Sequence, residues 1–177
     1  DTIGMDEPFY YRNKAQYPVG YDKGIITGFY AANSHRIIDF DNCYIGSKRN
    51  REILNIVKNF IVENNITAYD ETTGRGIVRH ILIREGHFTG EIMVCLIVNG
   101  SKFKYKTQLA EALKDVEGVK SVSVNYNTTK SNVILGDKVE TVYGSDFIID
   151  YIGDLKFEIS PLSFFQVNPV QTQKLYG

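Results

Sequence analysis

Met93-Val94-Cys95-Leu96-Ile97-Val98 is an apolar run in which no polar residue alternates with the hydrophobic ones. A strand that is buried on both faces of a sheet has this pattern, because neither row of its side chains meets water. We therefore expect an interior strand over 91–98, joined by a glycine-containing turn to a neighbouring strand over 77–85. Cys95 lies inside the run and is expected to be an inert core thiol.

Two predicted helices and a series of further strands surround this hairpin. Ile53, Val57, Phe60 and Ile61 recur at helical spacing after Ser47, which predicts a helix from Ser47 to about residue 63. A second helix is expected over 107–117. Further strands are predicted over 9–17, 24–30, 36–40, 122–126, 131–135, 139–143, 147–151 and 155–160. This order predicts an α+β fold with mostly antiparallel pairing and two main helices, rather than a regular βαβ alternation.

The stretch Ile159-Ser-Pro-Leu-Ser-Phe-Phe-Gln-Val-Asn-Pro169 lies between a predicted strand and a predicted helix. Asn168 is a good N-cap and Pro169 suits the first helical position. The turn between the predicted strand and the predicted helix carries two aromatic rings and one side-chain amide, which it can present to a ligand. The chain ends at Gly177, soon after this helix begins. We therefore expect a central α+β domain over 1–160 and the start of another domain over 161–177, cut from a longer enzyme.

The composition is that of a globular protein, with 43% hydrophobic and 23% charged residues among 177. No apolar run approaches the roughly 18 residues that a membrane span needs, so no membrane partner is expected. Two widely separated cysteines and the absence of a visible signal peptide favour a reducing cytoplasm and no disulfide framework. We also expect a monomer. The net charge of −1 argues against nonspecific coating of nucleic acid.

Local basic segments still leave an RNA-binding face open. Strand alternation over 9–17 puts Arg12, Lys14 and Gln16 on one face, where they can contact phosphates or a base edge. The alternative is an edge strand that its charges keep soluble. A second basic segment over 72–106 includes Arg79 and Arg84, and it too is either a binding patch or a solvated face.

Most catalytic motifs are missing from the sequence. We find no glycine-rich nucleotide fingerprint, no P-loop and no Ser-His-Asp or Cys-His arrangement. Three scattered histidines and two cysteines do not form a zinc site. His80 lies within a predicted strand, where a lone histidine is more often structural than catalytic. The residues alone therefore name no reaction.

Several segments in order along the chain resemble one family, the S-adenosylmethionine-dependent RNA uracil-5-methyltransferases that act on tRNA and 23S rRNA. The segments are Tyr11-Arg-Asn-Lys-Ala-Gln16, Gly28-Phe-Tyr30 with Ser34-His35, Asp41-Asn-Cys43-Tyr-Ile45, Gly76-Ile-Val-Arg-His80, Asn132-Val-Ile-Leu-Gly136, and 159–169 with Gln171 and Leu175-Tyr176. Their order and spacing over nearly the whole chain carry the resemblance.

The resemblance implies that this chain is the central domain of such an enzyme, with a Rossmann-like methyltransferase domain beginning at the final helix. Family members attack C6 of a flipped-out uracil with a cysteine, methylate C5 and then remove the C5 proton. The nucleophile, the base and the donor-binding loop would lie outside the chain, so it carries no catalytic residue of its own and should be inactive alone. The alternative is a non-catalytic RNA-binding or partner-docking module.

The resemblance also implies roles for individual residues. Gln166 matches the glutamine that contacts the methyl donor, S-adenosylmethionine, and Phe164 matches the aromatic residue at the target base. Arg12, Lys14 and Gln16 match the segment that faces the RNA, a ribosomal or transfer RNA. Cys43 matches the fourth ligand of the [4Fe-4S] cluster in cluster-bearing members. The other three ligands would precede Asp1, so no cluster is expected on this chain.

Overall fold

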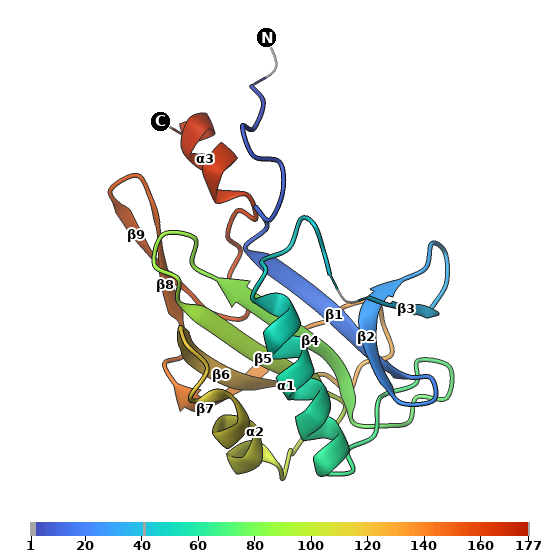
Figure 1. The fold of residues 1–177 in the computed structure, drawn as a ribbon. Coiled ribbons are helices and arrows are strands. Elements are labelled where there is room, and N and C mark those ends of the chain that lie inside the picture. The colour runs from blue at the N-terminus through green and yellow to red at the C-terminus, as the bar shows by residue number, and fades with distance from the viewer. Residues whose placement is uncertain (1–2, 41, 177) are drawn as a thin grey trace.

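The computed structural model describes residues 3–40 and 42–176. A twisted sheet of seven strands forms its centre (Figure 1). The order of the strands in the sheet is β3–β2–β1–β4–β5–β6–β7. The strands are β1 (Lys14–Tyr21), β2 (Ile25–Tyr30), β3 (Ile37–Asp39), β4 (Val78–Glu85), β5 (Ile92–Val98), β6 (Val119–Tyr126) and β7 (Lys138–Gly144). Pairing is antiparallel except between β5 and β6, which are parallel and connected through α2 (Lys106–Leu113). The α+β class with mostly antiparallel pairing is confirmed, and it contains one βαβ unit.

The interior hairpin is the one that the sequence predicts. Every residue of β5 is buried, and β4 pairs with it from Val78 to Glu85. β5 is flanked by β4 on one side and β6 on the other, so both its edges and both its faces are covered. Cys95 is fully buried there, and burial raises the pKa of its thiol to about 12. It therefore stays a neutral core thiol at physiological pH.

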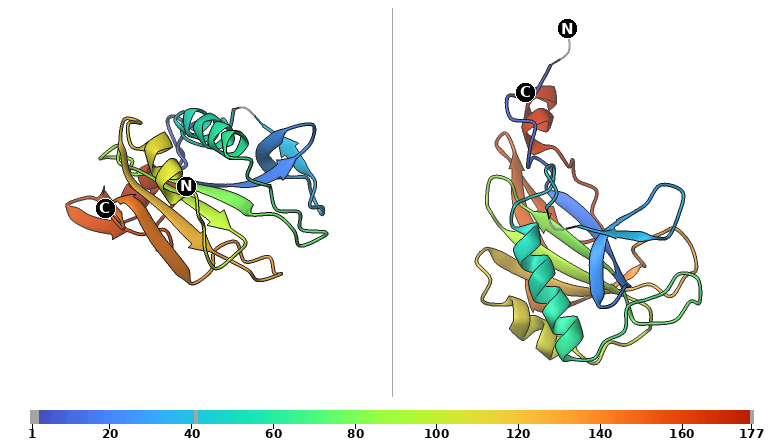
Figure 2. Two further views of the ribbon diagram at one scale, coloured as in Figure 1. Left: turned by 90° about the horizontal axis from the view of Figure 1, so that it is seen from below. Right: turned by 45° about the vertical axis from the view of Figure 1, so that its right-hand side comes forward.

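Two helices cover one face of the sheet (Figure 2). The predicted stripe of α1 (Asn50–Glu63), including Val57 and Ile61, packs with alternate residues of β1, β4, β5 and β6 in one large core. Each fully buried side chain of this kind contributes roughly 1.5–3 kcal/mol. The helix begins later than predicted, because Ser47 forms a turn whose hydroxyl accepts a hydrogen bond from the Arg49 amide at 3.1 Å.

The opposite face of the sheet is covered by the hairpin of β8 (Ile148–Ile152) and β9 (Leu155–Ile159) and by the loop 127–137. The strand predicted over 131–135 is wrong, since this segment is a loop. Its carbonyls at Val133 and Ile134 accept hydrogen bonds from the Asn127 side chain, at 2.7 and 2.9 Å, instead of from a neighbouring strand. β6 is already paired on both edges, so the loop lies across the sheet and packs Ile134 onto its surface.

The last helix, α3 (Pro169–Tyr176), lies beside the N-terminal segment (Figure 1). The side-chain amide of Gln171 donates a hydrogen bond to the Ile3 carbonyl at 2.8 Å, and the Lys174 ammonium donates one to the Gly4 carbonyl at 3.1 Å. The predicted domain division at residue 160 stays a prediction. None of the helices in residues 3–40 and 42–176 is long and apolar enough to cross a membrane.

Candidate functional site

The turn between β9 and α3 turns its two phenylalanines in opposite directions. Phe165 is buried, with its ring 5.5 Å from that of Phe157. Phe164 is 86% exposed, among the most exposed of the large hydrophobic residues that the structure describes. An exposed ring next to a buried one is free to meet an outside molecule while its neighbour fixes the backbone. The structure thus excludes the possibility that Phe164 belongs to the core of the chain.

Three hydrogen bonds hold the backbone around Phe164 in place. The Asn13 amide donates to the Val167 carbonyl at 3.0 Å, and the Asn13 side chain donates to the Gln166 carbonyl at the same distance. On the other side of the turn, the Ser160 amide donates to the Ser163 hydroxyl at 3.1 Å. These bonds connect the turn to the start of β1 and to the end of β9.

A buried arginine completes this support. Arg84, on β4, is only 3% exposed, and its guanidinium donates a hydrogen bond to the Ser163 carbonyl. Burial lowers the pKa of Arg84 to about 10, so the side chain remains a cation at neutral pH. Hydrogen bonds from a charged donor contribute roughly 1.5–3 kcal/mol. Arg84 therefore ties the residue before Phe164 to the interior of the sheet.

Gln166 presents its side-chain amide at the surface beside α3. The amide nitrogen lies 3.5 Å from the Tyr176 hydroxyl, at the limit of a hydrogen bond. The helix begins at Pro169, as predicted, and the Asn168 side chain accepts a hydrogen bond from the Gln171 amide at 3.1 Å. The N-cap and the first helical residue expected from the sequence are confirmed, and together they set the position of Gln166 next to the helix.

The predicted row of Arg12, Lys14 and Gln16 is only partly a strand face. Lys14 and Gln16 lie on β1, on the face opposite the helices, whereas Ala15 between them is buried in the core. Arg12 precedes the strand, and its Nε donates to the Lys14 carbonyl at 3.0 Å. Burial, then the charges of Arg84 and Arg12, lowers the pKa of Lys14. Three cations, Arg12, Lys14 and Arg84, are therefore neighbours at the start of β1.

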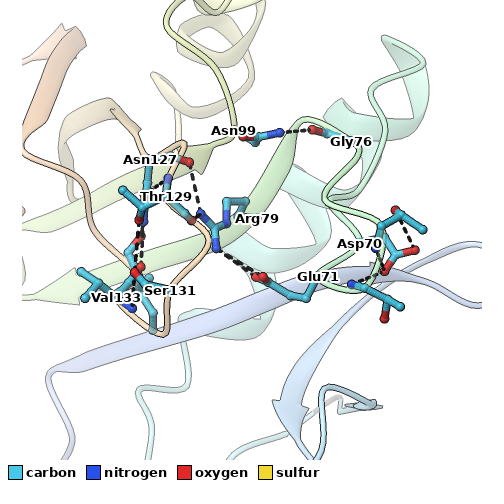
Figure 3. Close-up of polar contacts among 12 residues, drawn as sticks. Asp70, Glu71, Gly76, Arg79, Asn99, Asn127, Thr129, Ser131 and Val133 are labelled. Carbon is cyan, nitrogen blue, oxygen red and sulfur yellow. Dashed lines mark hydrogen bonds and ion pairs between the residues drawn. The ribbon is translucent and has the colours of Figure 1, made fainter.

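The second basic segment is not a binding patch at Arg79 or Arg84. Arg79 is 3% exposed and its guanidinium pairs with Glu71, at 3.1 Å, while it also donates to the carbonyls of Asn127 and Thr129 (Figure 3). Arg84 is likewise buried. For these two residues both predicted alternatives, a binding patch and a solvated face, are wrong, because both side chains are buried and have partners inside the molecule. The apolar residues that make up much of the same predicted strand, Val78 and Ile81-Leu-Ile83, were the available signal for burial.

Cys43 is half-buried, in a small cavity that Asn50 and Lys48 also line. In the part of the chain that the structure describes, no three His, Cys, Asp or Glu side chains gather to hold a metal ion. An iron–sulfur cluster usually takes four thiolates, and Cys95 is enclosed in β5. The described residues therefore do not form a cluster site. Asp41, in the segment around Cys43 that carries part of the resemblance, lies outside the described residues.

No protein-family model matches the chain. An uncharacterized RNA methyltransferase of Halalkalibacterium halodurans is 49% identical over 177 residues, and one of Clostridium tetani is 46% identical over 179. These matches cover 99% and 100% of this chain but 39% of each relative. The chain thus spans about two fifths of the length of the curated relatives it matches.

A solved structure has the same fold. The tRNA (uracil-54, C5)-methyltransferase of Pyrococcus abyssi, in complex with S-adenosyl-L-homocysteine, superimposes with a TM-score of 0.81 and 30% sequence identity. The match covers 96% of this chain and 40% of that one. The chain is therefore homologous, along its whole length, to a segment of the RNA methyltransferases, and its fold is that of the corresponding segment of a tRNA uracil-C5 methyltransferase.

Proposed function

We propose that the chain is the central part of a cytoplasmic RNA uracil-5-methyltransferase, which transfers a methyl group from S-adenosylmethionine to C5 of a uridine in ribosomal or transfer RNA. The observation that carries the proposal is the outward-facing Phe164 on a turn that Asn13 and Arg84 hold in place. The homologues named RNA methyltransferases and the solved uracil-C5 enzyme support it.

In this proposal, Phe164 stacks on the target uracil or on the base next to it. A base inside a helix cannot reach such a ring, so the nucleotide must leave its stack first. Base–aromatic stacking contributes roughly 1–3 kcal/mol per base, which helps to offset that cost. The buried Phe165 and the Arg84–Ser163 hydrogen bond keep the ring in position before RNA arrives.

Gln166 is the proposed contact to the methyl donor. S-adenosylmethionine supplies an electrophilic methyl group when bound. The exposed amide of Gln166 can both donate and accept a hydrogen bond, which suits the polar groups of such a donor. In this proposal the rest of the donor's site belongs to the methyltransferase domain, outside the chain.

Arg12, Lys14 and Gln16 are the proposed contacts to the RNA backbone, which the cationic start of β1 favours. The catalytic cysteine and base are likewise proposed to lie outside the chain, since Cys95 is a buried neutral thiol and Cys43 is proposed as a cluster ligand. Cys43 remains the proposed fourth ligand of a [4Fe-4S] cluster, with three thiolates from residues before Asp1. No step of the proposed reaction depends on that cluster.

The experiment measures 5-methyluridine formed by the full-length gene product on total RNA, by mass spectrometry. Gln166→Ala is expected to raise the KM for the donor and slow methylation, while thermal stability stays unchanged. Gln173→Ala, on α3, is the matched control. Unchanged kinetics in Gln166→Ala would remove this residue from the site. Absence of any methyl transfer, with a stop codon soon after codon 177, would favour a non-catalytic RNA-binding or partner-docking module instead.

A further inference from the structure

A cavity of about 240 Å³ lies between the β2–β3 hairpin and the loop 127–137, away from Phe164. We call it the Tyr30 pocket, and the side chains that matter here are Tyr30, His35, Glu71, Arg79, His80 and Asn132. Its volume is below the roughly 300–1,000 Å³ of pockets for drug-sized ligands. A single planar group suits it better than a larger molecule.

His80 lines this pocket with an unused hydrogen-bonding capacity. The residue is 3% exposed, and neither ring nitrogen has a hydrogen-bond partner among the described residues. Buried polar groups in folded proteins nearly always have partners, so this one requires an explanation. Burial, then the nearby charge of Arg79, lowers the pKa of His80 to about 4, so the ring is neutral. A neutral imidazole offers one donor and one acceptor.

The charges around the pocket favour an uncharged ligand. Arg79 already pairs with Glu71 at 3.1 Å and donates to two backbone carbonyls (Figure 3). No positive charge is therefore left over from this pair for a phosphate, and the Glu71 carboxylate would repel one. The neutral His80 ring adds no attraction for an anion either. The occupant should carry hydrogen-bond donors and acceptors but no net charge.

Aromatic rings form another wall of the pocket. The Tyr30 ring lies 5.8 Å from that of His35 and 6.2 Å from that of His80, both in edge-to-face arrangements. Tyr30 is 37% exposed, so part of its ring remains available to a ligand. Planar rings beside a neutral donor–acceptor pair match the chemistry of a nucleobase, which combines a π-face with a hydrogen-bonding edge.

One face of β4 connects the pocket to the turn that carries Phe164. His80 and Arg84 occupy the same face of β4, four residues apart, and Arg84 holds the turn that carries Phe164. At about 3.3 Å per residue, these two positions are roughly 13 Å apart. Nucleotides stacked at about 3.4 Å each cover that distance in about four steps.

We propose that the Tyr30 pocket binds a second unpaired nucleobase of the RNA, a few nucleotides from the base at Phe164, with Tyr30 against its face and His80 on its edge. The inference rests on the proposed function, since it assumes RNA on this side of the sheet. It adds a requirement for substrate choice: two bases, not one, must be free of pairing at a set spacing.

The test titrates the 177-residue chain with a fluorescently labelled single-stranded RNA and with versions in which one base at a time is removed. Loss of one base other than the target uracil should weaken binding about 5- to 150-fold. Tyr30→Leu should cause a loss of similar size on the intact RNA and should abolish the effect of removing that base. His80→Phe, which keeps a ring without the nitrogens, should also weaken binding.

Tyr143→Leu is the matched control, because Tyr143 is 36% exposed and lies on the helix side of the sheet. Equal binding by Tyr30→Leu and the unaltered chain, or an equal loss in Tyr143→Leu, overturns the assignment of the pocket. If Tyr30→Leu does not fold, the base-removal series on the unaltered chain decides, and a single sensitive base overturns the inference. Methylation by the full-length gene product is measured separately, so its presence with an insensitive pocket leaves the proposed function standing.

Discussion

Replacing either of two adjacent phenylalanines by alanine should have opposite consequences. Phe165 is buried against Phe157, Met93 and Ile148, and large-to-small substitutions of buried phenylalanine cost roughly 3–5 kcal/mol. For a chain of this length each kcal/mol lowers the Tm by about 2–4 °C, so Phe165→Ala should lower it by about 6–20 °C. Phe164 is 86% exposed, and Phe164→Ala should change stability by less than about 0.5 kcal/mol.

Phe164→Ala, which should leave the stability almost unchanged, should instead impair methyl transfer. Loss of one base–aromatic stack of roughly 1–3 kcal/mol lowers kcat/KM for methyl transfer about 5- to 150-fold in Phe164→Ala. The assay pairs thermal unfolding of the 177-residue chain with methyl transfer by the full-length gene product, and Phe164→Tyr, which keeps a ring, should retain activity. A fall in Tm of 6 °C or more in Phe164→Ala, or unchanged methyl transfer in a correctly folded variant, would refute the reasoning.

Three further measurements probe other parts of the molecule. Replacing Arg12 and Lys14 together by alanine should weaken RNA binding and reduce the salt slope by about 1.4, because each single-strand phosphate contact contributes about 0.7, whereas Lys58→Ala on α1 should leave the slope unchanged. His80 has a folded pKa of about 4, below its usual 6.5, so the unfolded state binds more protons between these values and stability falls as pH drops through them. Urea unfolding should show a loss of about 2 kcal/mol from this residue between pH 7.5 and 5, absent in His80→Phe; equal pH dependence in both would contradict the assignment. Cys95, fully buried with a pKa of about 12, should resist alkylation in the native chain and react after denaturation.

The elements that the sequence predicts correctly are those with strong local signals. The run from Met93 to Val98 is a strand buried on both faces, and the apolar stripe around Val57 is the inner side of a helix. The N-cap at Asn168 is also local, since its side chain bonds the amide three residues later. In each case the interactions that decide the structure lie within the element or follow from its pattern of burial.

The misjudged residues are those whose partners are distant in the chain. Arg79 reads as a surface cation until Glu71 and the carbonyls of the loop 127–137 are known to surround it. The segment 131–135 contains the apolar run Val133-Ile-Leu135, which favours a strand, but the carbonyls of Val133 and Ile134 accept hydrogen bonds from the Asn127 side chain. His80 looked structural, and the cavity beside it could not be inferred from one sequence. Such placements depend on tertiary contacts that no local pattern encodes.

The two sides of the central sheet should tolerate substitution by different rules. The side under α1 and α2 is built from interchangeable hydrocarbon groups, so volume is what a replacement there must preserve. The reverse side includes buried polar residues such as Arg84, and at Arg84 a replacement must preserve the donor whose hydrogen bond the Ser163 carbonyl accepts. In saturation mutagenesis of β4, Ile81 and Ile83 should therefore tolerate leucine, which has the same volume, better than valine, whereas almost no residue should replace Arg84.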